Sequence, residues 1–259
     1  MNFNTSHPSS ILKVTGLSCM LLLTLVSCSK DDKPTEIPEE EVVTTVPYYT
    51  QTRVNNLAAE SDDSNPTAAK PTLLYSLRTA KENPIADIKT SRWDVSFGGL
   101  YNSFLGGNNG SNSSNIAAGA KGQGGILIIE KTFDDVIDIP ADNQFKTGSN
   151  LYGADAAGAF GEGAGWYLYD FEGTVLGDGS EQKKHVVYPL TTETTTKQGK
   201  KVAPRTLVVK LPNGDFAKIK IISVYKDALT SNLWFKTTPK MFYTFDYMLA
   251  PKGSTKFTK

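Results

Sequence analysis

Residues 241–249 read MFYTFDYML, and this stretch decides the expected fold. Successive side chains of a β-strand point to opposite faces of the sheet. Every second residue of the stretch is apolar or aromatic and would share one face: Met241, Tyr243, Phe245, Tyr247 and Leu249. The remaining residues would share the other, more mixed face: Phe242, Thr244, Asp246 and Met248. The alternation predicts a strand with one face in a hydrophobic core.

Other segments of the chain carry similar strand patterns. Residues 206–211 (TLVVKL) and 215–225 (DFAKIKIISVY) flank Pro212-Asn213-Gly214, and Asn-Gly between two such runs predicts a β-hairpin. Residues 93–97 (WDVSF) alternate and predict a half-buried strand with Trp93, Val95 and Phe97 inward. Residues 125–129 predict a buried strand after a glycine-rich loop. Because no segment has a helical pattern longer than about two turns, we expect an all-β, mostly antiparallel domain.

Two loops stand out by their composition of Gly, Ala, Asn and Ser. They are residues 106–124 (GGNNGSNSSNIAAGAKGQG) and 153–165 (GADAAGAFGEGAG). Glycine permits open backbone shapes at an entropic cost. The loops are therefore interpreted either as flexible surface loops or as the lip of a ligand cleft that orders on binding.

Charge and motif content exclude several classes of protein. Lys plus Arg and Asp plus Glu both number 27 among 259 residues, so a basic footprint for nucleic acid is absent. Two Cys and two His are too few for a Cys/His zinc cluster or a disulfide framework, and no C-x-x-C-H motif for covalent haem is present. The chain has neither a phosphate-binding loop nor a G-x-S-x-G motif. We expect a binding protein, not an enzyme.

The N-terminal segment has the pattern of a lipoprotein signal peptide. An apolar run from Leu17 to Val26 follows Lys13 and ends at Ser27-Cys28, which resembles the bacterial lipobox. Residues 1–28 would then be removed as far as Cys28, which would be lipidated; an ordinary secretory signal with an incidental Cys is the alternative. Ser29-Lys30-Asp31-Asp32 resembles the surface-export signal of Bacteroidetes lipoproteins, or else is a solvated charge run. The expected location is the outer membrane, lipid-anchored and surface-exposed.

Removal of residues 1–28 would leave 259 − 28 = 231 residues. Residues 29–46 are rich in Asp, Glu, Thr and Pro and predict a flexible tether, followed by a β domain over 47–259. Cys28 is the only Cys of this mature chain, which excludes an intrachain disulfide. His185 is its only His, which excludes any mechanism that needs two histidines in one chain.

Between about residues 50 and 257 a series of short segments occurs in a characteristic order. The segments are Asn56-Leu57-Ala58-Ala59, Tyr75-Ser76-Leu77, Trp93-Asp94-Val95-Ser96-Phe97, Phe133-Asp134-Asp135-Val136, Pro140-Ala141-Asp142, Gly165-Trp166-Tyr167-Leu168-Tyr169-Asp170, Asn213-Gly214-Asp215-Phe216-Ala217-Lys218, Tyr225-Lys226-Asp227 and Phe242-Tyr243-Thr244-Phe245-Asp246-Tyr247. Behind a lipoprotein signal, this order resembles the HmuY family, haem-binding lipoproteins of Bacteroidetes. The resemblance implies a hand-shaped β domain that holds haem b non-covalently in a cleft between strand groups and passes it to a TonB-dependent outer-membrane receptor.

The resemblance also directs attention to possible iron ligands. The founding member of the family uses two His, and this chain departs from that pattern. His185, in HVVYPL (185–190), is the candidate His ligand, since a neutral imidazole binds haem iron well. Its alternative is a solvated strand-end His beside Lys183 and Lys184.

Three residues are candidates for a second axial position. Met241 and Met248 offer thioether sulfur, and Tyr152 offers a phenolate to ferric iron. Core or surface packing is the alternative for each of them. One axial ligand can also hold haem where a cleft buries the porphyrin faces.

A different class of function stays open beside haem binding. The chain could be a surface binding or adhesion module without haem, for a glycan or a partner protein. Trp234 and Phe235, in a polar loop after Asp227, would then form an exposed aromatic platform.

Overall fold

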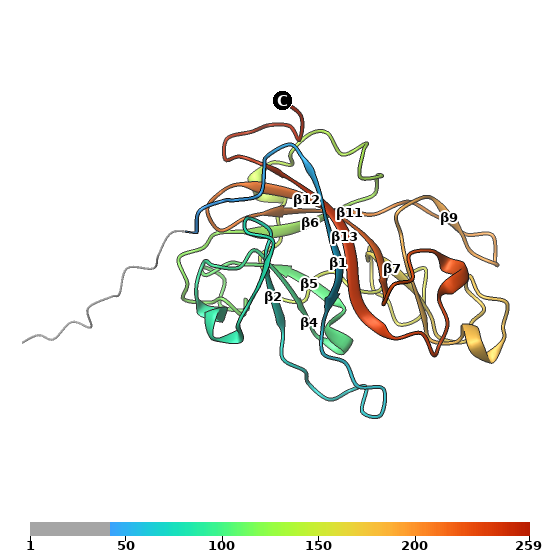
Figure 1. The fold of residues 1–259 in the computed structure, drawn as a ribbon. Coiled ribbons are helices and arrows are strands. Elements are labelled where there is room, and N and C mark those ends of the chain that lie inside the picture. The colour runs from blue at the N-terminus through green and yellow to red at the C-terminus, as the bar shows by residue number, and fades with distance from the viewer. Residues whose placement is uncertain (1–41) are drawn as a thin grey trace, which may run out of the picture. The chain divides into compact units, whose positions relative to one another are not determined.

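The computed structural model describes residues 42–259 of the chain (Figure 1). These residues form thirteen strands and five short 3-10 helices, without an α-helix, so the all-β, antiparallel prediction is confirmed. None of the helices in this part of the chain is long and apolar enough to cross a membrane. The predicted signal peptide 1–28, Cys28, the export signal at 29–32 and most of the tether lie outside the described residues.

The strands form two main sheets and two small ones, and every strand pair is antiparallel. The largest sheet has the order β1 (Gln51–Ala58), β13 (Lys240–Ala250), β12 (Phe216–Tyr225), β11 (Thr206–Lys210) and β6 (Gly125–Ile129). The second sheet has the order β3 (Lys81–Asn83), β2 (Leu73–Ser76), β4 (Val95–Gly98) and β5 (Phe104–Gly107). The small sheets are β7 (Tyr167–Asp170) with β8 (Val186–Pro189), and β9 (Thr194–Thr195) with β10 (Lys201–Val202). The 3-10 helices are η1 (Ile85–Lys89), η2 (Leu100–Asn102), η3 (Asp142–Gln144), η4 (Glu181–Lys183) and η5 (Ser231–Leu233).

The predicted hairpin and the predicted C-terminal strand are both present. β11 and β12 pair from Leu207 opposite Ile219 to Lys210 opposite Phe216, and residues 211–215 close the turn. Gly214 has φ +92°, a conformation that glycine adopts without steric cost. β13 lies between β1 and β12, so it is hydrogen-bonded along both edges (Figure 1).

One face of β13 forms the centre of the main core. Tyr243, Phe245 and Tyr247 are all 0% exposed. The Phe245 ring lies 5.7 Å from Tyr75 of β2 in an edge-to-face arrangement, and the Tyr243 ring lies 4.5 Å from Phe97 of β4. These contacts join the two main sheets. The burial of this face confirms the strand predicted from the alternation of residues 241–249.

The two buried tyrosines of this face also satisfy their hydroxyl groups. Tyr243 donates a hydrogen bond to the carbonyl oxygen of Asn102 at 2.7 Å. Tyr247 donates to the carbonyl oxygen of Leu77 at 3.0 Å. Since a buried hydroxyl without a partner is costly, these bonds fix where residues 77 and 102 must lie against the large sheet.

The other face of the large sheet is covered too. A second cluster of buried residues lies there: Val136, Phe145, Val208, Phe216, Ala250 and Phe257. Lys218 of β12 is 5% exposed on this side. Its ammonium donates to the carbonyl oxygens of Phe133 and Val136 at 2.7 and 3.0 Å, and so holds the 133–136 turn against the sheet.

The strand predicted over 93–97 is present as β4, and Trp93, Val95 and Phe97 are buried as predicted, but the expected exposure of its other face is wrong. All of β4 is buried, and Asp94 just before it is 0% exposed. Asp94 pairs with the buried Arg78, with 2.8 Å between Oδ1 and the guanidinium Nε. Trp93 packs in a separate cluster with Leu74 and with Ala117 of the 106–124 loop. The 106–124 loop therefore covers the face of the sheet that the alternation of residues 93–97 predicts to be exposed to solvent.

The last residues of the predicted tether contact the domain. The backbone N–H groups of Thr45 and Val46 both donate to the carbonyl oxygen of Arg78, at 2.9 and 3.0 Å. Val46 is 8% exposed and belongs to the main core. Among the described residues, contacts with the β domain therefore include a few residues before residue 47.

We expect Asp94→Ala to lower the free energy of unfolding by about 3–5 kcal/mol, because it leaves the Arg78 guanidinium buried without a counter-charge. Guanidinium chloride denaturation measures this loss. Asp138→Ala is the control, since that carboxylate is 82% exposed and 3.9 Å from Lys256, and it should leave stability unchanged. Equal losses in both variants would contradict the assigned role of the buried pair.

Candidate functional site

His185 lies at the loop end of the β7–β8 hairpin. Asp170 and Val186 form the last residue pair of this hairpin, and Phe171 and His185 follow directly beyond it. The His185 N–H donates to the carbonyl oxygen of Phe171 at 3.2 Å. His185 has φ +60°, a left-handed conformation that costs energy for residues other than glycine and is found disproportionately at functional sites.

The His185 side chain belongs to a cluster of rings at the surface, here called the His185 cluster: Phe160, Tyr169, Phe171 and His185. The Tyr169 hydroxyl lies 2.8 Å from His185 Nδ1. The Phe171 ring stands edge-on to the imidazole at 4.9 Å, and Phe160 lies 5.1 Å from Phe171. Phe160 is 78% exposed. The cluster therefore presents an apolar aromatic surface beside a polar imidazole.

Burial and charge set the protonation of this pair. Partial burial lowers the pKa of His185, and the charges of Lys236 and Lys240 lower it further. Burial raises the pKa of Tyr169, so its phenol stays protonated at neutral pH. The imidazole is then neutral at pH 7. When its Nδ1–H donates to Tyr169, the lone pair that could bind a metal lies on Nε2.

The 153–165 loop that carries Phe160 is held by one buried carboxylate. Asp155 is 4% exposed, and its Oδ2 accepts hydrogen bonds from the Gly165 N–H at 3.0 Å and the Arg205 guanidinium at 2.8 Å. Its Oδ1 accepts from the Ala157 N–H at 2.9 Å. Asp155 thus connects the start and the end of the loop to the residue that precedes β11.

Glycine lets this loop lie directly on β7. A Cβ atom at Gly158 would come within 2.6 Å of the Tyr169 backbone nitrogen. The Ala159 N–H donates to the Tyr169 carbonyl oxygen at 2.8 Å. The interpretation of 153–165 as a flexible surface loop is therefore wrong, because its glycines serve close packing. The loop places Phe160 beside Tyr169.

The 106–124 loop is anchored in a similar way. Asn115 is 4% exposed and donates to the carbonyl oxygens of Gly107 and Thr147 at 2.9 and 2.7 Å. Asn109 is 5% exposed and donates to the carbonyl oxygen of Gly124 at 2.7 Å. Buried asparagines, which look like surface residues in the sequence, hold this loop in place, so its interpretation as flexible is also wrong.

Tyr152, a predicted iron ligand, lies elsewhere in the core. It is 4% exposed, and its backbone bridges to Leu105. The Lys146 ammonium lies 5.5 Å above its ring, and its hydroxyl bonds to the backbone of Ile128. Burial raises the pKa of Tyr152, which disfavours a phenolate. None of these neighbours of Tyr152 belongs to the His185 cluster.

Met241 and Met248 lie on opposite faces of β13. Met241 is 3% exposed in the main core and has φ +66°. Met248 is partly buried against the cluster on the other face of the sheet. The two sulfur atoms cannot therefore serve one iron together. Met241 directly follows Lys240, whose charge acts on His185, so it is at the same end of β13 as the His185 cluster.

The expectation that Trp234 is an exposed platform is wrong. Trp234 is 6% exposed, its indole N–H donates to the carbonyl oxygen of Ala228 at 2.9 Å, and its ring stacks on Tyr225 at 5.7 Å. Phe235 is partly exposed, with the Lys183 ammonium 3.9 Å above its ring. The polar context of the loop suggests exposure, but partners distant in sequence bury the indole. Phe160, which the sequence patterns did not single out, is 78% exposed.

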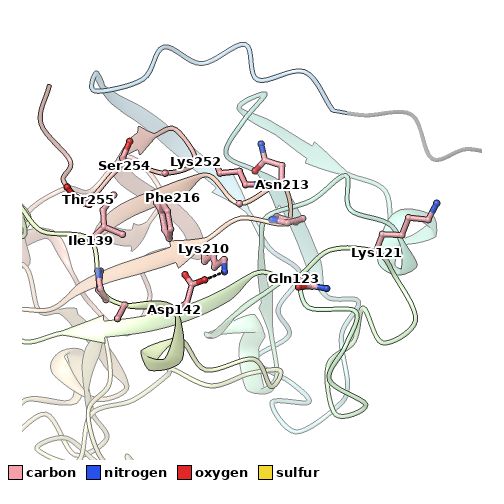
Figure 2. A pocket seen from close by; sticks show the side chains of 15 residues that line it. Lys121, Gln123, Ile139, Asp142, Lys210, Asn213, Phe216, Lys252, Ser254 and Thr255 are labelled. Atoms are coloured by element: carbon pink, nitrogen blue, oxygen red, sulfur yellow. Dashed lines mark hydrogen bonds and ion pairs between the residues drawn. The ribbon is translucent and has the colours of Figure 1, made fainter.

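A pocket of about 600 Å³ lies at the turn of the β11–β12 hairpin (Figure 2). Its lining includes Lys121, Lys210, Phe216 and Lys252, and it contains none of the ligand residues expected from the sequence. In the described part of the chain, no three His, Cys, Asp or Glu side chains gather closely enough to hold a metal ion.

The similarity of this chain to known proteins is weak. No family model and no curated protein matches the chain. Among solved structures, the apo form of an HmuY analog from Tannerella forsythia is similar at 13% sequence identity and a TM-score of 0.35, with 78% of this chain and 96% of that chain covered. Similarity this weak assigns no ligand to the chain.

We expect Asp155→Asn to loosen the 153–165 loop, because it removes the charge that faces Arg205 and weakens the bonds to Ala157 and Gly165. Hydrogen exchange of these two amides should accelerate at least about tenfold, which corresponds to a loss of about 1.4 kcal/mol in local stability. Glu162→Gln, an exposed change in the same loop, is the matched control and should leave both amides as slow as in the unaltered protein. Unchanged exchange in Asp155→Asn would show that the carboxylate does not hold the loop.

Proposed function

We propose that the chain is a surface lipoprotein that binds haem non-covalently through His185 and does no chemistry on it. The observation that carries this proposal is the hydrogen bond between Tyr169 and His185 Nδ1 beside the exposed ring of Phe160; in the tautomer that has the proton on Nδ1, Nε2 of the neutral imidazole would be the iron ligand. The ordered segments that resemble the HmuY family support the same ligand.

Each member of the His185 cluster has a part in this proposal. Tyr169 would orient the imidazole through its hydrogen bond to Nδ1, as hydrogen-bonded partners of metal-binding His commonly do. Phe160 and Phe171 offer ring surface that a porphyrin would cover, and burial of apolar area supplies most of the affinity. Lys236 and Lys240 are nearby cations, and pairing with the haem propionates would require them to exchange their present partners Glu181 and Asp63.

We further propose that His185 is the single strong axial ligand. Tyr152 is enclosed by other partners, and Met248 lies on the far face of the sheet. Met241 is the remaining candidate for a weak second bond, from the same end of β13. Coordination through one residue would suit a carrier that must release haem to a TonB-dependent outer-membrane receptor. Anchoring by lipid on Cys28 would keep the carrier at the cell surface.

A second candidate function is a surface module that binds a glycan or a partner protein without haem. The exposure of Phe160 supports it, because a single large apolar ring held rigidly at a surface suits contact with either partner. Phe160 then replaces Trp234 as the expected platform.

Titration of haemin into the purified protein should give a saturable, sharpened Soret band. His185→Ala should abolish or shift this band, because it removes the proposed ligand. Tyr152→Phe and Met248→Leu are matched controls and should leave the spectrum unchanged. An unchanged spectrum in the His185→Ala variant would contradict His185 as the ligand. The absence of any saturable band would favour the surface module that binds a glycan or a partner protein without haem.

Haem affinity should be constant from about pH 8 down to about pH 6.5 and fall only below that range. A proton competes with iron for the imidazole, and the lowered pKa of His185 places this competition below the ordinary value near 6.5. Spectrophotometric titration at a series of pH values measures the profile. Weakening that begins above pH 7 would contradict the environment assigned to His185.

A further inference from the structure

The pocket at the β11–β12 turn carries an excess of positive charge. Its lining contains the ammonium groups of Lys121, Lys210 and Lys252 against one carboxylate, that of Asp142. Lys210 pairs with Asp142 at 2.6 Å. Within residues 42–259, neither Lys121 nor Lys252 forms an ion pair, and both are exposed. Two cations are therefore available to a ligand with negative groups.

The positive charges are spread out and do not converge on one point. Lys121 belongs to the loop before β6, Lys210 ends β11, and Lys252 follows β13. Figure 2 shows Lys121 on a separate segment from Lys252, with the Lys210–Asp142 pair in another part of the lining. This distribution suits an extended anion with separated negative groups better than a single compact ion.

The rest of the lining suits a polyhydroxylated ligand. Amide and hydroxyl groups of Gln123, Asn213, Ser254 and Thr255 can donate and accept hydrogen bonds. Phe216, which is 7% exposed and packs against another ring at 6.0 Å, contributes apolar surface. A sugar ring presents hydroxyl groups at its edge and C–H groups on its face, so it matches both kinds of surface.

The turn that forms the pocket is held by a buried carboxylate, that of Asp215. Asp215 accepts hydrogen bonds from the Lys252 N–H at 2.9 Å, the Asn213 side chain at 2.8 Å and the Tyr48 hydroxyl at 2.8 Å. These bonds place residues 213 and 252 before any ligand arrives. A site held in this way loses little conformational entropy when it binds.

We propose that this pocket binds an acidic oligosaccharide, a short glycan with carboxylate or sulfate groups along its length. The volume of about 600 Å³ is in the range of small-ligand sites. The site is separate from the His185 cluster, because the pocket lies where β12 begins and the cluster acts at the Lys240 end of β13. Binding of the glycan is independent of haem.

The test is isothermal titration of the full chain with a chondroitin sulfate tetrasaccharide. Binding should saturate at one site and weaken as salt rises. The double substitution Lys121→Gln with Lys252→Gln should weaken it about tenfold, from the loss of two exposed charge contacts. Lys81→Gln with Lys89→Gln removes the same charge from β3 and η1 and should leave the affinity unchanged. His185→Ala should also leave it unchanged.

Three outcomes would overturn the proposal. The first is absence of saturable binding, and the second is equal weakening in the Lys81/Lys89 variant, which would mean non-specific charge attraction. The third is equal affinity for a neutral tetrasaccharide such as chitotetraose, or for inorganic sulfate, because the pocket would then not be selective for an extended anion. Thermal unfolding of each variant should match that of the unaltered chain, so that a lost site is distinguished from a lost fold.

Discussion

The burial of the aromatic face of β13 is the constraint on which the rest of the structure depends. Tyr243, Phe245 and Tyr247 have no exposed surface and touch rings of both β2 and β4. Their apolar area drives the two main sheets together, while the tyrosine hydroxyls bond to backbone carbonyls of the second sheet and its connections. Burial of the rings stabilises the contact between the sheets, and the hydrogen bonds of the hydroxyl groups fix how the two sheets pack.

The same strand connects the two surfaces to which functions are proposed. The charge of Lys240 at its start acts on His185, and Lys252 just beyond its end lines the pocket. Under each surface, a buried carboxylate accepts hydrogen bonds from backbone N–H groups and so fixes a loop. Asp155 holds the loop that carries Phe160, and Asp215 holds the hairpin turn of the pocket. Rigid support of this kind lets short loops present binding groups without an α-helix or a disulfide in the described part of the chain.

Sequence patterns predict correctly those strands that are specified by the residues of their own segment. The alternation of 241–249 and the Pro-Asn-Gly turn at 212–214 locate β13 and the β11–β12 hairpin correctly. They do not show that Asp94 is buried or that Trp234 is covered, because Arg78 and Tyr225 act from elsewhere in the chain. The glycine-rich loops mislead for a related reason, since glycine at 158 serves close packing. His185 is a candidate ligand from the sequence because it is the only His of the mature chain. That it lies beside Tyr169, Phe171 and Phe160 is seen only in the folded structure.

The most direct test of the haem proposal is pulsed electron paramagnetic resonance of the ferric haem complex, with ¹⁵N placed only in histidine. In an H7A background, His185 carries the only label. The account predicts that the nitrogen coupling assigned to an axial ligand changes to the pattern of ¹⁵N on labelling. A spectrum of saturably bound haem that is the same with and without the label would contradict ligation by His185, and with it the role assigned to the His185 cluster.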